Sequence, residues 1–133
     1  MKKFLTALVA AIVLNMSPAE AETQTYEGTG VFTITQGETQ NVAKKRAKLE
    51  AERDALEQIY LYVKAQSSSK NSKLTKDEIV TVAAGLMNVL KTKFDVTKED
   101  EFFVVTATVI AEIDPDEIPE AVEREKNRRL QNN

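Results

Sequence analysis

Within the segment from Thr39 to Gln66, alanine recurs four times at a spacing of four residues, and this spacing constrains the fold more than any other feature of the chain. Residues four apart lie on one face of an α-helix, and Thr39 can cap its first turn. A stripe of small side chains lets a helix lie close on a sheet, while larger side chains fill the space beside it. The pattern therefore predicts a sheet-facing helix rather than a coiled-coil or partner-binding seam. The small residues are Ala43, Ala47, Ala51 and Ala55, and the larger ones are Leu49, Leu56, Ile59, Tyr60 and Val63.

The segment before this helix alternates with a period of two, which indicates a β-strand from Tyr26 to Thr35 that Gln36 and Gly37 end. One face of this strand carries Gly28 and Gly30. Glycine weakens a strand, so the pair makes sense where a bulge bends the strand or where another backbone lies close over that face. The opposite face carries Glu27, Thr29, Val31, Thr33 and Thr35.

Thr75 and Glu78 match the capping-box spacing just before an apolar run, which predicts a second, shorter helix. We expect this helix to stop at Gly85. The polar run Ser67–Lys73 has no glycine to wrap an anion, so we interpret it as a solvated connector rather than a phosphate-binding loop. The segment 85–90 fits either a helix or a strand, and the sequence leaves this open.

Two alternating runs, separated by the charged stretch 98–101, predict an antiparallel hairpin. The first run covers about Leu90–Val96. The second covers Phe102–Ile113 and is the strongest strand signal in the chain. One face of this second strand is not strongly polar, so either the helices cover it or it is exposed and available to a protein partner. The candidate contact residues on it are Phe102, Val104, Thr106, Thr108 and Ile110.

Pro119 is well placed as the first residue of a final helix that reaches about Leu130. Acidic residues come early in this helix and basic residues late, which suits the helix dipole. Its apolar content is thin, so we expect it to lie loosely on the domain edge or to fray until it meets a partner.

These patterns together predict an α+β fold. A three-stranded antiparallel sheet has a long and a short helix packed on it, in the order β-α-α-β-β-α, and the chain ends in a C-terminal amphipathic helix. We expect a single domain over residues 22–114, followed by the last helix and tail over residues 115–133.

The segment Met1–Ala21 reads as an export signal and not as part of the fold. Lys2 and Lys3 precede the apolar run Phe4–Leu14, which is shorter than the roughly twenty residues that cross a bilayer. The small residue Ala19 stands two positions before Ala21, the spacing that signal peptidase recognises. We therefore expect cleavage after Ala21, and a periplasmic mature chain that does not insert into the membrane.

Composition removes several classes of chemistry. The chain has no cysteine and no histidine. These absences exclude nucleophilic sites of the Ser-His-Asp and Cys-His types and zinc sites built from thiolates or imidazoles. The missing cysteine also removes the acylation site of a bacterial lipoprotein. A net charge of −3 with interleaved signs argues against a nucleic acid or an anionic membrane as partner.

One acidic cluster, just before the last helix, could suggest a metal site or a catalytic carboxylate pair. It lacks the central glycine of a calcium loop, and an exposed linker is a poor place to separate two carboxyl pKa values. We interpret these residues as helix capping and surface charge, and we expect no catalytic residue, metal or cofactor. They are Asp114, Asp116, Glu117 and Glu120.

Nearly all of the chain after the export signal resembles a known type of domain. The shared pattern is a glycine-flanked first strand, an alanine-spaced helix, a Val-x-x-x-Ser-Ser segment near Val63–Ser68 and a closing valine-rich strand. In these features the chain resembles the N-terminal domain of the flagellar assembly protein T and the related domain of small bacterial outer-membrane lipoproteins. The resemblance implies an α/β module of the Gram-negative envelope that binds other proteins and has no known catalytic activity.

We therefore expect a non-catalytic, exported protein-interaction module of the bacterial cell envelope. The alternative, from another class, is a periplasmic protein that binds a small ligand or a metal in a cleft between helix and sheet. An enzyme that relies on carboxylates alone is the third and least favoured hypothesis.

Overall fold

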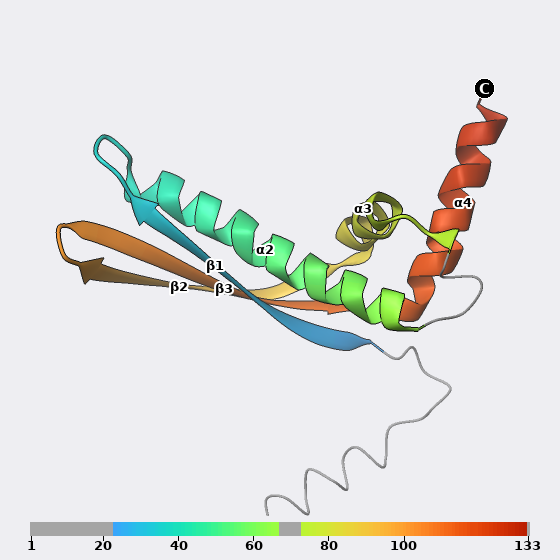
Figure 1. Ribbon diagram of the computed structural model, residues 1–133, viewed down its shortest axis with the longest axis horizontal. Helices are drawn as coiled ribbons and strands as arrows, with labels where there is room; N and C mark the ends of the chain where they lie inside the picture. The colour runs from blue at the N-terminus through green and yellow to red at the C-terminus, as the bar shows by residue number, and fades with distance from the viewer. Residues whose placement is uncertain (1–22, 67–72, 133) are drawn as a thin grey trace, which may run out of the picture.

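The elements of the computed structural model, which describes residues 23–66 and 73–132, follow the order β-α-α-β-β-α (Figure 1). The three strands form one antiparallel sheet in the spatial order β1-β3-β2. The expected α+β class and element order are confirmed. The expected export signal Met1–Ala21 and most of the expected connector Ser67–Lys73 lie outside the described residues. The elements are β1 (Gln24–Ile34), α2 (Gln40–Ala65), α3 (Lys76–Leu86), β2 (Asn88–Glu99), β3 (Phe102–Ile113), the 3₁₀ turn η2 (Pro115–Glu117) and α4 (Ile118–Gln131).

The alanine stripe of α2 lies directly on the glycines of β1. A Cβ atom at Gly28 would lie 2.8 Å from the backbone nitrogen of Ala55, and it would come still closer to the carbonyl oxygen of Ala51. A Cβ atom at Gly30 would meet the backbone of Ala47 and Ala51 in the same way. Of the two explanations for the glycine pair, the close backbone is the correct one. The alanines and glycines together let the helix axis approach the sheet.

The core has two parts that differ in side-chain size. Under the first half of α2, the alanine stripe packs on the small and medium side chains of β3. Farther along the same helical face, Ile59 and Val63 replace alanine at the same four-residue spacing. They join large side chains of α3, α4 and the end of β3. The second cluster contains Ile59, Val63, Leu74, Ile79, Ala83, Ile113, Ile118 and Val122.

Both predicted helix caps are present. The Thr39 side chain accepts a hydrogen bond from the Val42 backbone nitrogen at 3.2 Å, at the start of α2. At the start of α3, the Glu78 backbone nitrogen donates to Thr75 Oγ1 at 3.2 Å, and the Thr75 backbone nitrogen donates to Glu78 Oε1 at 2.9 Å. These bonds satisfy backbone donors that a helix start leaves without a partner.

Three details differ from the expectation. Gly85 does not stop α3, which continues to Leu86, because the cost of a helical glycine, about 1 kcal/mol, is not large enough to end the helix there. Strand β2 begins at Asn88, and Leu90 falls in the register shift between Val89 and Lys91, so it is a bulged residue and not part of the alternation. Leu49 is 55 % exposed and does not fill space beside the sheet.

The final helix is anchored in its first half. Ile118 and Val122 are buried in the second core cluster, and Lys126 forms an ion pair with Glu78 of α3 at 3.0 Å. Beyond these residues α4 extends away from the sheet, and Leu130 is exposed (Figure 1). The helix therefore belongs to the core at its start and projects at its end, which corrects the expectation of a loosely placed helix.

Candidate partner-binding face of the sheet

Helix α2 covers one face of the sheet, α3 and α4 pack on the same side near its end, and the opposite face, here called the open face, has no described helix against it (Figure 1). On β3, side chains alternate between the two faces. Val105, Ala107, Val109 and Ala111 are fully buried under α2. The alternate residues therefore point to the open face.

The register defines the open face row by row across β1, β3 and β2. On this face the central strand β3 carries mainly threonine and aliphatic side chains. Most charged side chains lie on β2, and two more, Glu27 and Glu112, lie near one end of the sheet. In order along the strands, the rows are Thr25–Glu112–Asn88, Glu27–Ile110–Lys91, Thr29–Thr108–Lys93, Val31–Thr106–Asp95 and Thr33–Val104–Thr97, and the last is the pair Phe102–Glu99.

All five residues that the sequence marked as candidate contacts lie on this face, in a line along β3. Their accessibility differs more than the sequence suggests, because β3 is the central strand and side chains from both neighbours screen it. Phe102 is 50 % exposed at the hairpin end, whereas Val104 is only 9 % exposed. Thr106, Thr108 and Ile110 have intermediate exposure.

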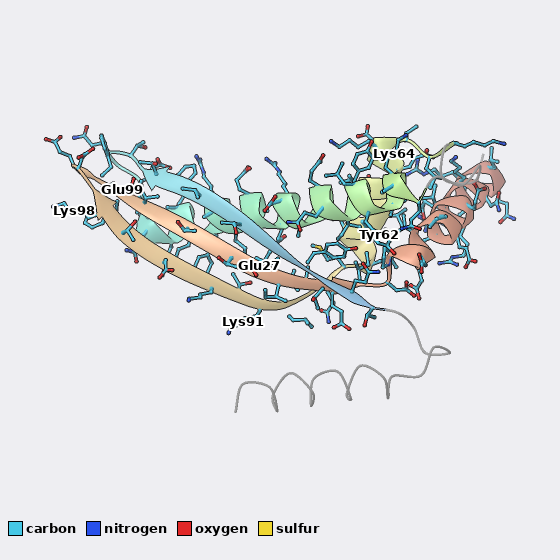
Figure 2. The ribbon with its side chains drawn as sticks, turned by 60° about the horizontal axis from the view of Figure 1, so that its bottom comes forward. Glu27, Tyr62, Lys64, Lys91, Lys98 and Glu99 are labelled. Atoms are coloured by element: carbon cyan, nitrogen blue, oxygen red, sulfur yellow. The ribbon has the colours of Figure 1, made fainter. Side chains whose placement is uncertain are left out.

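The edge strands supply the most accessible part of the open face, and the sequence pattern did not single out this part. Val31 of β1 is 56 % exposed. Glu27 and Lys91 stand on either side of Ile110 in the same row (Figure 2). The alternation of β1 already put Glu27 and Val31 on a common face. The sequence did not show that β1 pairs with β3, so it could not place Glu27 and Val31 on the same face as the candidate contact residues of β3.

Both edges of the sheet are protected against strand addition. On β1, the Gln58 side chain donates to the Glu27 carbonyl oxygen at 2.7 Å, and Asp54 Oδ2 accepts from the Thr29 backbone nitrogen at 2.9 Å. Helix α2 therefore satisfies backbone groups that an edge strand would otherwise offer to another chain. On β2, the bulge at Leu90 and several exposed lysines serve the same purpose.

A shallow groove of about 470 Å³ separates α3 from α4 on the helix side. Its walls combine apolar and charged side chains, and it continues toward the Glu78–Lys126 ion pair. The Thr75 backbone hydrogen bond and the Lys126 ammonium lower the pKa of Glu78. The lining includes Thr81, Val82, Leu86, Ala121, Glu125 and Arg129.

The tyrosines near the second core cluster form a hydrogen-bonded link. The Tyr26 hydroxyl donates to Gln24 Oε1 at 2.8 Å, and Gln24 Nε2 donates to the Tyr62 hydroxyl at 3.2 Å. Burial raises the pKa of Tyr26, and the neighbouring Tyr62 adds to this effect. The link joins the start of β1 to the end of α2, so we interpret it as structural.

One residue of the acidic cluster before α4, Asp114, caps the short turn that precedes the helix. Asp114 Oδ1 accepts a hydrogen bond from the Asp116 backbone nitrogen at 3.1 Å and so caps η2. Within residues 23–66 and 73–132, no group of three or more acidic side chains is arranged to hold a metal ion.

The fold and the open face define a small α+β domain whose sheet carries helices on one side only, as far as the chain is described. No helix in that part of the chain is both long enough and apolar enough to span a bilayer. Comparison of the chain with protein-family models, curated proteins and solved structures gives no match. The resemblance to the flagellar and lipoprotein domains therefore stays a prediction from the sequence.

Proposed function

We propose that the chain is a non-catalytic, exported protein-interaction module of the bacterial cell envelope, and that the open face is its binding surface. The observation that carries the proposal is the asymmetry of the sheet. One face is sealed by an alanine-glycine contact, whereas the other presents threonines and aliphatic side chains on β1 and β3, bordered by the charged residues of β2. The export signal in the sequence supports the envelope location.

The amino-acid types on the open face suit a protein partner. A soluble protein that leaves one sheet face against water usually makes it strongly polar. Here the central strand β3 holds Val104 and Ile110, and Val31 of the neighbouring strand β1 is more than half exposed. Apolar positions flanked by charges at the margin are the arrangement found in protein interfaces.

Photo-cross-linking in cells tests the proposal. A photoreactive residue replaces Thr97, which is exposed on the open face, and in a control variant it replaces Lys45, which is exposed on α2. We expect a protein adduct from position 97 and none from position 45. No adduct from position 97, or equal adducts from both positions, would contradict the proposal.

For the second candidate function, small-ligand binding, we propose the α3–α4 groove, which lies between two helices and not between helix and sheet as expected from the sequence. It is open to solvent, and its walls mix charges of both signs. A thermal-shift screen tests this alternative, because a ligand that binds only the folded state raises the melting temperature as its concentration increases. Arg129→Ala, in the groove wall, should remove such a shift, whereas Lys45→Ala should leave it unchanged.

A further inference from the structure

The open face carries opposite charges at its two margins in one row. Glu27 on β1 and Lys91 on β2 both pair with Ile110 on β3. Two strand spacings separate Glu27 from Lys91, about 10 Å, so the two charges do not neutralise each other within one copy. A partner that brings a positive charge over Glu27 and a negative charge over Lys91 would satisfy both.

A second copy of the same chain meets this requirement. A two-fold axis that runs along β3, between two facing sheets, places β1 of one copy over β2 of the other. Each row then lies opposite the same row of the second copy, with the β1 residue of one copy facing the β2 residue of the other. Glu27 of each copy faces Lys91 of the other, and Ile110 faces its own counterpart. Such an interface is self-complementary, as two-fold symmetry requires.

We propose that two copies of the chain associate through their open faces, with reciprocal Glu27–Lys91 ion pairs at the margins. This inference rests on the proposed function and names its partner. Packed sheets lie about 10 Å apart and are rotated by about 30°. At that spacing the long Glu27 and Lys91 side chains can meet. In this arrangement Glu112 of one copy also faces Glu112 of the other. Because Glu112 lies at the end of the central strand, the rotation between the two sheets moves these like charges apart.

The contact surface is large enough for a reversible dimer. Strands of 11, 12 and 12 residues form the face. At spacings of about 4.8 Å between strands and 3.3 Å per residue, each copy contributes a footprint of roughly 500 Å². Two copies together reach about 1,000 Å², the lower limit of specific interfaces. We therefore expect a dissociation constant in the micromolar range.

The other surfaces leave fewer ways for two copies to meet. Asp54 and Gln58 occupy backbone groups on the edge of β1, and the bulge and lysines protect β2. A face-to-face dimer has helices outside and two sheets inside, a layered arrangement that buries the aliphatic side chains on the open face of β3 in both copies.

Charge reversal tests the dimer by analytical ultracentrifugation of the purified protein at concentrations from below to well above micromolar. We expect Glu27→Lys and Lys91→Glu each to weaken dimerisation by about tenfold, since each change places like charges together at two symmetric positions. The double variant Glu27→Lys/Lys91→Glu restores the ion pairs in reverse and should return the dissociation constant to near that of the wild type. Lys45→Glu, on the outer side of α2, is the matched control and should have no effect. Circular dichroism confirms that each variant is folded.

A monomeric wild type at every concentration, or a dimer that the double variant does not restore, would overturn the inference. These failures can be separated from failure of the proposed function. If the wild type is monomeric while the probe at position 97 captures a different protein in cells, the second-copy inference is wrong and the interaction module stands. If position 97 captures nothing and the wild type is monomeric, both are wrong.

Discussion

Gly28 and Gly30 are the residues on which the position of α2 depends. The backbone of α2 occupies the space where a side chain on either glycine would lie. The sequence predicted a structural reason for these glycines, since glycines in a strand indicate either a bulge or a close backbone. The sequence could not decide between them, because the choice depends on which helix face meets the strand. The alanine stripe is recognised as the face of α2 that meets the strand only after α2 and β1 are placed together.

We predict that Gly28→Ala destabilises the protein by about 3 kcal/mol or more, because the new Cβ forces the backbone of α2 away from the sheet. Gly85→Ala is the matched control. No atom lies within 4 Å of a Cβ atom at Gly85, which is exposed within α3. This control should stabilise the protein by about 0.5–1 kcal/mol. Urea unfolding of both variants measures the difference, and equal small effects would show that α2 does not lie this close.

Glu78 connects α3 to α4 through its charge. Its pKa is lowered from the ordinary value of 4.5 by the Thr75 backbone hydrogen bond and by Lys126. A carboxyl with a lowered pKa stabilises the folded state above its unfolded-state pKa. That contribution is lost as the pH falls through the folded-state value, below 4.5.

We predict that Glu78→Gln lowers the melting temperature slightly at pH 7, because glutamine keeps the capping geometry but not the attraction to Lys126. The difference from the wild type should shrink as the pH falls below 4.5. Thermal unfolding followed at several pH values checks this. A difference that stays constant down to pH 2 would mean that the charge of Glu78 has no role.

At the scale of elements, the helices and strands follow from local patterns with few exceptions. The two caps at Thr39 and Thr75 are short-range signals, and both are present. The boundary between α3 and β2 was not predictable, because Gly85 is tolerated in an exposed helix and because the bulge at Leu90 breaks the alternation. Edge protection of β1 was also invisible in the sequence. Asp54 and Gln58 are ordinary helix-surface residues until α2 lies beside the strand.

We predict that Asp54→Ala speeds amide hydrogen exchange at Thr29 by about tenfold, the factor that corresponds to a hydrogen bond of roughly 1.4 kcal/mol. Asp54→Asn is the matched control, since its side-chain oxygen can still accept from the same amide. Exchange followed by nuclear magnetic resonance gives the rate at each backbone position. If Thr29 exchanges at the same rate in the wild type and in Asp54→Ala, the side chain of Asp54 does not seal the edge.

At the scale of the whole molecule, the central feature is a sheet with helices on one side only. The sequence placed Phe102, Val104, Thr106, Thr108 and Ile110 on one face but left open whether helices cover it. Coverage depends on where α3 and α4 pack, and large side chains at the end of α2 hold both of them on the helix side. The charged margins of the face were beyond prediction, because they depend on the register of three strands.

Thiol labelling in cells tests the binding role of the open face most directly, because the chain has no cysteine of its own. Val31→Cys places a thiol on the open face, and Leu49→Cys places one on the outer side of α2. The native side chains are 56 % and 55 % exposed. We expect a maleimide to label position 31 at least about tenfold more slowly in cells than in dilute purified protein, since a bound partner covers it. Position 49 should react equally fast in both. Equal labelling of position 31 in cells and in dilute solution would contradict the account.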